Sequence, residues 1–183
     1  MIYKFYRQRI FPHLLNQVMQ TASLMDKRRE LLLPVAGEVL EIGFGTGLNL
    51  PFYQQVDTLY ALEPNPDIYR LAAQRVHEAP FEVQHIQASA EKLPFASASL
   101  DHIVSTWTLC SIASLEQALA EICRVLKPGG ALHLVEHVLH SENRNIERAL
   151  KDAGLELAEC RYFDAEGIPK IAQRMLLARA VRP

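Results

Sequence analysis

The chain of 183 residues is short of cysteine, of net charge and of long apolar runs. Its three cysteines, Cys110, Cys123 and Cys160, lie far apart and lack the paired spacing of a zinc site or a CxxC redox motif. We expect them to be reduced thiols in a cytoplasmic protein. The formal net charge of −2 provides no basic field for binding phosphates, which argues against a nucleic-acid partner.

No stretch approaches the roughly 18 consecutive apolar residues that a membrane-spanning helix requires. Near the amino terminus, Lys4, Arg7 and Arg9 interrupt the apolar residues, so no signal peptide is predicted there. These basic residues lie beside Phe5 and Phe11, a combination that allows weak adsorption to a membrane surface and no more.

Hydrophobic residues make up 49% of the chain, enough to fold one domain around a single core. Residues 1–36 are predicted to form a helical cap in two pieces, because Pro12 interrupts any single helix. Residues 37–137 form the predicted core. Residues 138–183 are predicted to form a substrate-side segment with edge strands.

Short apolar runs alternate with amphipathic segments through the core. This alternation indicates a largely parallel sheet between layers of helices, so we predict an α/β fold with three layers. The predicted strands span 39–43, 58–63, 81–87, 100–106 and 131–137, and the predicted helices span 48–55, 66–78 and 114–127.

The end of the chain has a different pattern. A predicted helix over 146–154 precedes two alternating apolar segments, 155–163 and 172–181, without an obvious helix between them. Such strands are typical of an antiparallel pair at a sheet edge. Upstream, residues 127–130 (Lys-Pro-Gly-Gly) are predicted to close the helix 114–127 and open the next strand, because proline cannot extend a helix and glycine accepts the left-handed conformation.

A glycine-rich turn follows the first predicted strand. Gly43, Gly45 and Gly47 let the backbone turn sharply and approach a ligand, at the edge where open α/β sheets bind ligands. Glu63 ends the second predicted strand, where a carboxylate can accept hydrogen bonds from both ribose hydroxyls. We therefore predict a nucleoside ligand rather than an empty turn. Leu48 stands where a dinucleotide-binding loop has a third small residue, which disfavours a pyrophosphate.

Four motifs in this order resemble the class I S-adenosylmethionine-dependent methyltransferases. They are the glycine loop, Glu63-Pro64-Asn65-Pro66, and the segments 88–95 and 124–130. The runs EIGFGTGLNLPFY, TLCSI, EICRVLKPGG and VEHV are similar to a branch that includes alkyl-thiol methyltransferases. The resemblance covers about residues 37–137. It implies a Rossmann-like fold with a mostly parallel seven-stranded sheet and an antiparallel edge pair.

The resemblance also implies the cofactor S-adenosyl-L-methionine and assigns residues to it by position. Ser89 stands where the family often has aspartate, so the hydrogen bond to the adenine amino group is expected from the backbone or a neighbour. Thr106 sits where the family's backbone meets the methionine and the reacting methyl group. Glu41, Gly43, Gly45, Thr46 and Gly47 are assigned to the methionine part, Glu63 and Pro64 to the ribose, and Ser89, Ala90 and Glu91 to the adenine.

Methyl transfer requires alignment and, for some acceptors, a base. His137 is the candidate base, with a packed strand-end histidine as the alternative, and Thr106 is the second catalytic candidate. Cys110 is expected to be a small buried side chain, and Trp107 either walls the acceptor pocket or belongs to the core. The histidines show no ligand spacing, and we predict no metal.

The resulting expectation is a methyltransferase that acts on a small apolar acceptor, with a thiol favoured over an amine, a phospholipid head group or a quinone precursor. The segment after His137 is shorter than in the branch, which motivates a non-catalytic cofactor-binding module as the alternative. An NAD-dependent oxidoreductase is the third hypothesis, and Leu48 argues against it. We expect residues 3–11 to act as a lid and leave the oligomeric state open.

Overall fold

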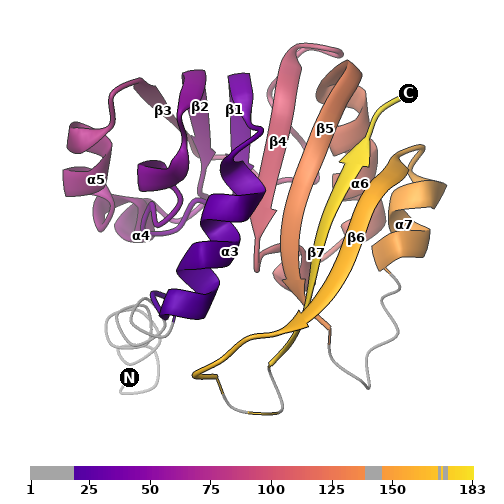
Figure 1. The fold of residues 1–183 in the computed structure, drawn as a ribbon. Coiled ribbons are helices and arrows are strands. Elements are labelled where there is room, and N and C mark those ends of the chain that lie inside the picture. Colours follow the sequence, from indigo (N-terminus) through magenta and orange to yellow (C-terminus); the bar gives the residue numbers. More distant parts are fainter. Residues whose placement is uncertain (1–18, 139–145, 169, 171–172) are drawn as a thin grey trace, which may run out of the picture.

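The computed structural model describes residues 19–138, 146–168, 170 and 173–183. In these ranges the chain forms one seven-stranded sheet in the order β3-β2-β1-β4-β5-β7-β6 (Figure 1). The strands are β1 (Ala36–Ile42), β2 (Gln55–Leu62), β3 (Glu82–Ile86), β4 (Leu100–Thr106), β5 (Leu126–His137), β6 (Glu156–Asp164) and β7 (Arg174–Val181). The helices are α3 (Ala22–Leu32), η2 (Leu50–Phe52), α4 (Pro66–Arg70), α5 (Ala73–Glu78), η3 (Leu109–Ser111), α6 (Leu115–Val125) and α7 (Ile146–Asp152).

Strands β1 to β5 are parallel, whereas β7 is antiparallel to both β5 and β6. The chain leaves β1 toward β2 on one side and returns to β4 on the other. The carboxyl ends of β1 and β4 therefore flank the topological switch point, where open α/β sheets bind ligands. This confirms the predicted α/β class, including the antiparallel edge pair.

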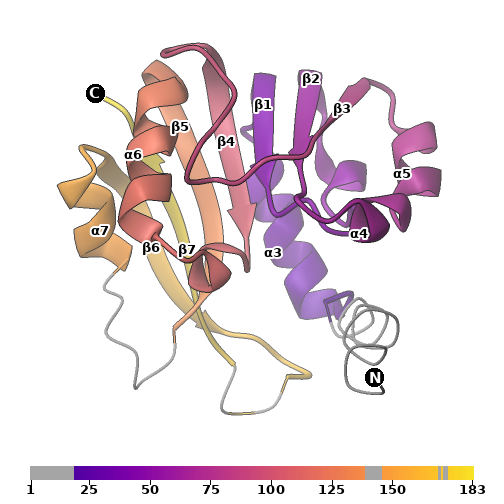
Figure 2. The same cartoon turned by 180° about the vertical axis from the view of Figure 1, so that it is seen from behind.

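Helices cover both faces of the sheet. Figure 1 shows α3 in front of the sheet, and Figure 2 shows α6 in front of the opposite face. Leu31 and Leu32 of α3 pack in one buried cluster with Val39 of β1. Leu119 of α6 packs in the other with Ile103 of β4. The sheet with these two helical layers is the predicted three-layer sandwich.

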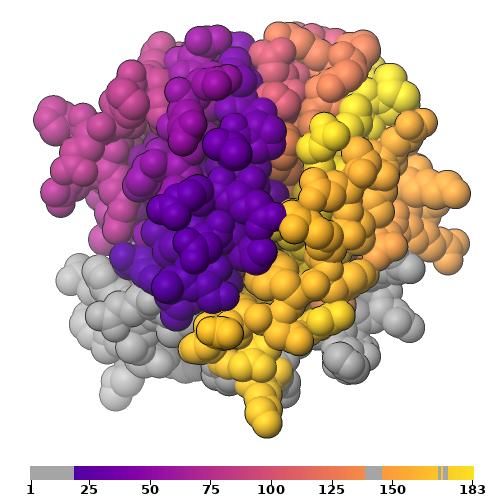
Figure 3. All heavy atoms as spheres, in the orientation of Figure 1, coloured from indigo at the N-terminus to yellow at the C-terminus, as the bar shows by residue number. Residues whose placement is uncertain are grey.

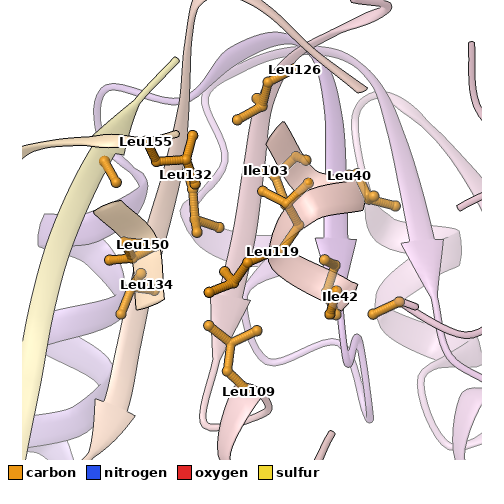
Figure 4. Packing of buried hydrophobic residues seen from close by; sticks show 14 of the residues in the cluster. Leu40, Ile42, Ile103, Leu109, Leu119, Leu126, Leu132, Leu134, Leu150 and Leu155 are labelled. Atoms are coloured by element: carbon orange, nitrogen blue, oxygen red, sulfur yellow. The ribbon is translucent and has the colours of Figure 1, made fainter. Parts of the chain in front are cut away.

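Helix α6 illustrates how the sequence determines this packing. Ala118, Leu119, Ile122 and Val125 recur at helical spacing and are fully buried. Figure 4 shows Leu119 beside the sheet leucines and isoleucines of the same cluster. Burying the side chain of Leu119, Ile122 or Val125 stabilises the fold by about 1.5–3 kcal/mol each.

Two predicted helices are wrong in extent. The segment 48–55 forms only the short 3-10 helix η2, because Pro51 provides no backbone N–H and the neighbouring Asn49 and Tyr53 point buried polar groups inward. The segment 66–78 is divided into α4 and α5.

The predicted boundary at residues 127–130 also differs. Helix α6 ends at Val125, and residues 127–130 lie inside β5. Gly129 N donates to Arg182 O at 2.8 Å, and Arg182 N donates to Gly130 O at 2.9 Å. This pairing with the end of the chain keeps the two glycines in the strand.

At the amino terminus, the described part of the predicted cap contains the helix α3. The first piece and the predicted lid at residues 3–11 lie outside the described residues. Among the described helices, none combines the length and the apolar character needed to cross a membrane.

Candidate functional site

The glycine loop adopts a conformation that requires its glycines. Gly43, Gly45 and Gly47 all have positive φ, at 71°, 59° and 74°. Gly43 N and Phe44 N both donate to Leu62 O, which ties the loop to the end of β2. A Cβ at Gly43 would lie 2.1 Å from Thr108 Oγ1, whereas a Cβ at Gly45 would meet nothing closer than Gly43 O at 3.7 Å. The backbone at Gly45 is therefore open on one side.

Glu63 lies directly beside this loop, as the sequence spacing predicts. The side chain is 7% exposed. Its Oε2 accepts a hydrogen bond from Gly45 N at 3.1 Å, and Oε1 accepts one from Asn65 N at 3.0 Å. His85 Nε2 lies 2.9 Å from Glu63 O, and its ring stacks on Tyr69 with centroids 3.8 Å apart. These contacts fix the turn that contains Pro64.

The segment assigned to the adenine follows β3 at the same edge of the sheet. Ser89 Oγ donates to the Glu91 carboxylate, and this hydrogen bond is the main cause that lowers the pKa of Glu91. Ser114 N donates to Glu91 Oε1 at 3.3 Å. Ala90 is buried. In the glycine loop, the carbonyl of Thr46 accepts a hydrogen bond from Arg75 Nη1 at 3.0 Å.

Glu41 belongs to a buried polar network behind the loop. Its carboxylate accepts hydrogen bonds from Asn49 Nδ2 at 2.9 Å and from Tyr53 OH at 2.7 Å. Arg28 Nη1 of α3 donates to Asn49 Oδ1 at 2.6 Å. Thr106 Oγ1 accepts from Asn49 Nδ2 at 3.2 Å and from Arg28 Nη1 at 3.3 Å. The network thus joins α3, β1, the loop and the end of β4.

Burial changes the charges of this network. Desolvation raises the pKa of Glu41 to about 7, against the hydrogen bonds of Tyr53 and Asn49 and the charge of Arg28. Desolvation likewise lowers the pKa of Arg28 to about 10, so this side chain remains a cation at neutral pH. A cation thus sits beside a carboxyl group that is only partly ionised.

Sequence reasoning missed Arg28, Asn49 and Tyr53. A signal for Arg28 was present, because it lies four residues after Leu24 and three before Leu31 on the buried stripe of α3. A charge at such a position must find buried partners.

The raised pKa of Glu41 predicts a pH-dependent stability. An unfolded carboxyl near 4.5 ionises before the folded one near 7, so folding stability is lost as pH rises through this window. We expect the free energy of unfolding of wild type, relative to Glu41→Gln, to fall by about 1–3 kcal/mol between roughly pH 5 and pH 7.5. Urea unfolding at both pH values measures this difference. Glu116→Gln, on an exposed position of α6, is the control, and a pH-independent difference for Glu41→Gln would contradict the raised pKa.

The end of β4 leads into the other half of the site. Trp107 has a positive φ of 55°, and its Nε1 donates to Met175 Sδ at 3.0 Å. The Arg28 guanidinium lies 4.6 Å from the Trp107 ring centroid. Trp107 is half-buried and packs with the apolar clusters of the α3 face, so it combines core contacts with a place at the ligand edge.

Glu136 of β5 holds the turn that follows Trp107. Its Oε1 accepts hydrogen bonds from Thr108 N at 2.9 Å and from Leu109 N at 2.8 Å. The side chain is fully buried, and desolvation raises its pKa. Cys110 lies in this turn and is exposed, so the expectation of a buried cysteine is wrong. These backbone hydrogen bonds hold the start of η3 against the end of β5.

His137 ends β5 and is half-buried. It lies two residues beyond Val135, which pairs with Thr106 of β4 and packs on the α3 face. Strand alternation places the His137 side chain on this same face. Burial lowers the pKa of His137, so the imidazole is neutral at neutral pH.

Two further features lie away from this edge. A groove of about 510 Å³ lies between α7 and the start of β6. It lies at the opposite end of the parallel strands from the glycine loop and Glu63, so it is not part of the candidate site. His133 Nε2 lies 3.1 Å from His102 Nδ1 between the middle of β4 and β5. No group of three potential metal ligands occurs among the residues that the structure describes.

The comparison with known proteins decides the family. A family model described as a methyltransferase domain matches residues 40–134, more than half of the chain. The chain belongs to this methyltransferase family. It is the class I, S-adenosylmethionine-dependent family that the sequence motifs indicate, and the match spans the glycine loop and Glu63.

Two relatives show how similar the chain is to characterised methyltransferases in sequence. The chain is 35% identical over 141 residues to the thiol S-methyltransferase TMT1A of Homo sapiens, covering 70% of this chain and 58% of that protein. It is 29% identical over 118 residues to a phosphatidylethanolamine N-methyltransferase of Cereibacter sphaeroides, covering 62% of this chain and 58% of that one. The chain thus spans somewhat more than half the length of these relatives.

A solved structure supports the fold. A putative methyltransferase from Bacillus halodurans C-125 superposes with a TM-score of 0.74 at 18% identity, covering 88% of this chain and all of that chain. The cofactor of this family is S-adenosyl-L-methionine, and two observations show that the site fits its parts. The backbone at Gly45 is open where a Cβ would stand, and the Glu63 carboxylate borders that opening.

Proposed function

We propose that this methyltransferase moves the methyl group of S-adenosylmethionine to the sulfur of a small, apolar thiol. The observation that carries the proposal is the pairing of an open glycine loop beside Glu63 with a neutral histidine at the end of β5. The 35% identity to a thiol S-methyltransferase supports sulfur as the acceptor atom.

The bound cofactor supplies an electrophilic methyl group on a sulfonium sulfur. The chain's own residues then have to bind, orient and exclude water. The loop residues Gly43 to Gly47 let the backbone approach the methionine part, with Glu41 fixing the loop from behind through Asn49. Glu63 accepts hydrogen bonds from the ribose hydroxyls. The remaining residues have the roles that the family resemblance assigns by position. Pro64 lies at the ribose and Thr106 at the reacting methyl group. The adenine is bound by Ser89, Ala90 and Glu91.

His137 takes the proton of the acceptor. A thiol is a poor nucleophile until it loses its proton, and a neutral imidazole accepts that proton at neutral pH. Thr106 contributes through its position, because its hydroxyl already accepts hydrogen bonds from Arg28 and Asn49.

Two alternatives keep specific support. The relative named as a phosphatidylethanolamine N-methyltransferase favours an amine on a lipid head group as the second acceptor class. The short connection from His137 to α7 at Ile146 motivates a module that binds the cofactor without turnover. The family assignment replaces the NAD-dependent oxidoreductase hypothesis.

The deciding experiment is release of S-adenosylhomocysteine by the purified chain with S-adenosylmethionine and 1-propanethiol. We expect release that depends on the thiol, with methyl propyl sulfide as product. 1-Propanol and 1-propylamine are the matched controls, since only the acceptor atom changes. Release with propylamine or with phosphatidylethanolamine vesicles, and none with the thiol, would contradict sulfur specificity. Cofactor binding with no product from any acceptor would favour the non-catalytic module.

A further inference from the structure

Arg28 has a hydrogen-bonding edge that the polar network does not use. Its hydrogen bonds to Asn49 and Thr106 both leave from Nη1. Nε is buried without an acceptor, and within the described parts of the chain no residue accepts a hydrogen bond from Nη2. Nε and Nη2 form the side of a guanidinium that can bind a carboxylate through two parallel hydrogen bonds.

The charge of Arg28 is incompletely balanced as well. Glu41 is the carboxylate that acts on it, yet the Glu41 oxygens accept hydrogen bonds from Asn49 and Tyr53. Burial also raises the pKa of Glu41 to about 7, so this group carries less than a full negative charge at neutral pH. A cation buried in this way favours a further anion.

The segments next to Arg28 in the sequence contain few carboxylates that could pair with it. Residues 1–25 contain no aspartate or glutamate, so the segment that leads into α3 supplies no carboxylate. On α3 itself, Asp26 pairs with Arg29, and Glu30 pairs with Lys27 and with Arg161 of β6. Among the residues that the structure describes, none accepts a hydrogen bond from Nε or Nη2, which leaves this edge of Arg28 for a ligand.

The position of Arg28 agrees with a ligand site. The side chain reaches from α3 to Thr106 at the carboxyl end of β4 and to Asn49, two residues after the glycine loop. The guanidinium carbon of Arg28 lies over the Trp107 ring, 4.6 Å from its centroid. Figure 3 shows α3, in indigo, packed against the carboxy-terminal part of the chain, and Leu24 clusters with Ala165 and Ile168 there. The helix that carries Arg28 is thus held in place from both sides.

We propose that Nε and Nη2 of Arg28 bind a ligand carboxylate at the switch point of the sheet. Two ligands of a methyltransferase bring this group: the amino-acid part of S-adenosylmethionine and an acidic acceptor. The inference rests on the proposed function for the acceptor, whereas the cofactor source requires only the family assignment.

The first test compares S-adenosylhomocysteine with its decarboxylated analogue by calorimetry on wild type and Arg28→Lys. Lysine keeps a charge near Asn49 but loses the two-donor edge. We expect wild type to bind S-adenosylhomocysteine more tightly than the analogue. In Arg28→Lys the affinity for S-adenosylhomocysteine should fall about tenfold, whereas the affinity for the analogue should change little. Arg29→Lys, the same change at the exposed neighbouring arginine, should keep the preference.

The second test addresses the acceptor. Two thiols, 1-propanethiol and its carboxylate-bearing counterpart 3-mercaptopropionate, are compared through their Michaelis constants in the same variants. In one outcome, the Michaelis constant in Arg28→Lys rises for 3-mercaptopropionate alone while the preference for S-adenosylhomocysteine over its analogue stays intact. That result would assign the carboxylate to the acceptor and still support the site. The site would be overturned if Arg28→Lys weakened binding of both cofactor analogues equally and raised the Michaelis constants of both thiols equally. It would also be overturned if neither the ratio of the two affinities nor the ratio of the two Michaelis constants changed.

A variant that fails to fold does not remove the test. Should Arg28→Lys be unfolded, equal affinity of wild type for both cofactor analogues, together with equal Michaelis constants for both thiols, overturns the site equally. Failure of thiol methylation leaves the calorimetric comparison unaffected, so the two proposals fail separately.

Discussion

Replacing Gly45 with valine is expected to lower the affinity for S-adenosylhomocysteine by about 100-fold or more. The space beside Gly45 is open, with the nearest atom, Gly43 O, 3.7 Å from a Cβ placed there. The proposed ligand occupies that space, so the added isopropyl group would displace it. Glu63 would also lose its present contact with Gly45 N if the loop shifted, which removes a second element of the same site.

Gly129→Val is the matched control for this prediction. Gly129 has a similar left-handed φ of 82°, a Cβ there meets nothing within 4 Å, and the residue lies at the opposite end of β5. Both variants thus incur backbone strain of about 1–2 kcal/mol, but only one fills the site. Calorimetry on both folded variants separates strain from ligand exclusion. Unchanged affinity in Gly45→Val would mean that the ligand does not approach this loop.

The sheet could be predicted because its information is local. Each strand is a short apolar run, and the turn chemistry between runs is carried by glycine and proline. The spacing between Gly43 and Glu63 predicts that loop and acid meet, and they do so through the hydrogen bond from Gly45 N. The antiparallel edge follows from the two segments that have no helix between them.

The polar network could not be predicted because it is a tertiary arrangement. The apolar spacing of segment 48–55 favours a helix, but Asn49 and Tyr53 are drawn inward by Glu41 and leave only a 3-10 turn. Arg28 meets Thr106 across 78 residues of sequence. The turn that contains the exposed Cys110 is similar, since Glu136 binds its backbone from another strand.

The network also explains how α3 can influence the chemistry. A buried guanidinium that bonds Asn49 and Thr106 ties the helix to both halves of the proposed site. Buried polar groups are costly when a partner is lost, so displacement of α3 would disturb the loop and the end of β4 together. Arg28 therefore links α3 to the proposed site through hydrogen bonds, in addition to the apolar packing of the helix.

His137→Gln is expected to lower the turnover rate with 1-propanethiol by about 100-fold or more, the scale of general base catalysis, and to leave S-adenosylhomocysteine binding unchanged. Glutamine retains a polar side chain of similar reach but cannot accept the thiol proton at neutral pH. His102→Gln is the control, because His102 is also half-buried, has a pKa lowered by burial, and lies on β4 four residues before Thr106.

The pH dependence distinguishes a base from a packed histidine. Burial lowers the pKa of His137 below 6.5, so the neutral and active form prevails above that value. The wild-type rate should rise with pH through this lowered pKa and then level off across neutral pH. In His137→Gln that limb should vanish, and the rate should instead increase with pH toward the pKa of the thiol, because only pre-formed thiolate reacts. An acidic limb that persists in the variant would assign the titration to another group and remove His137 from the mechanism.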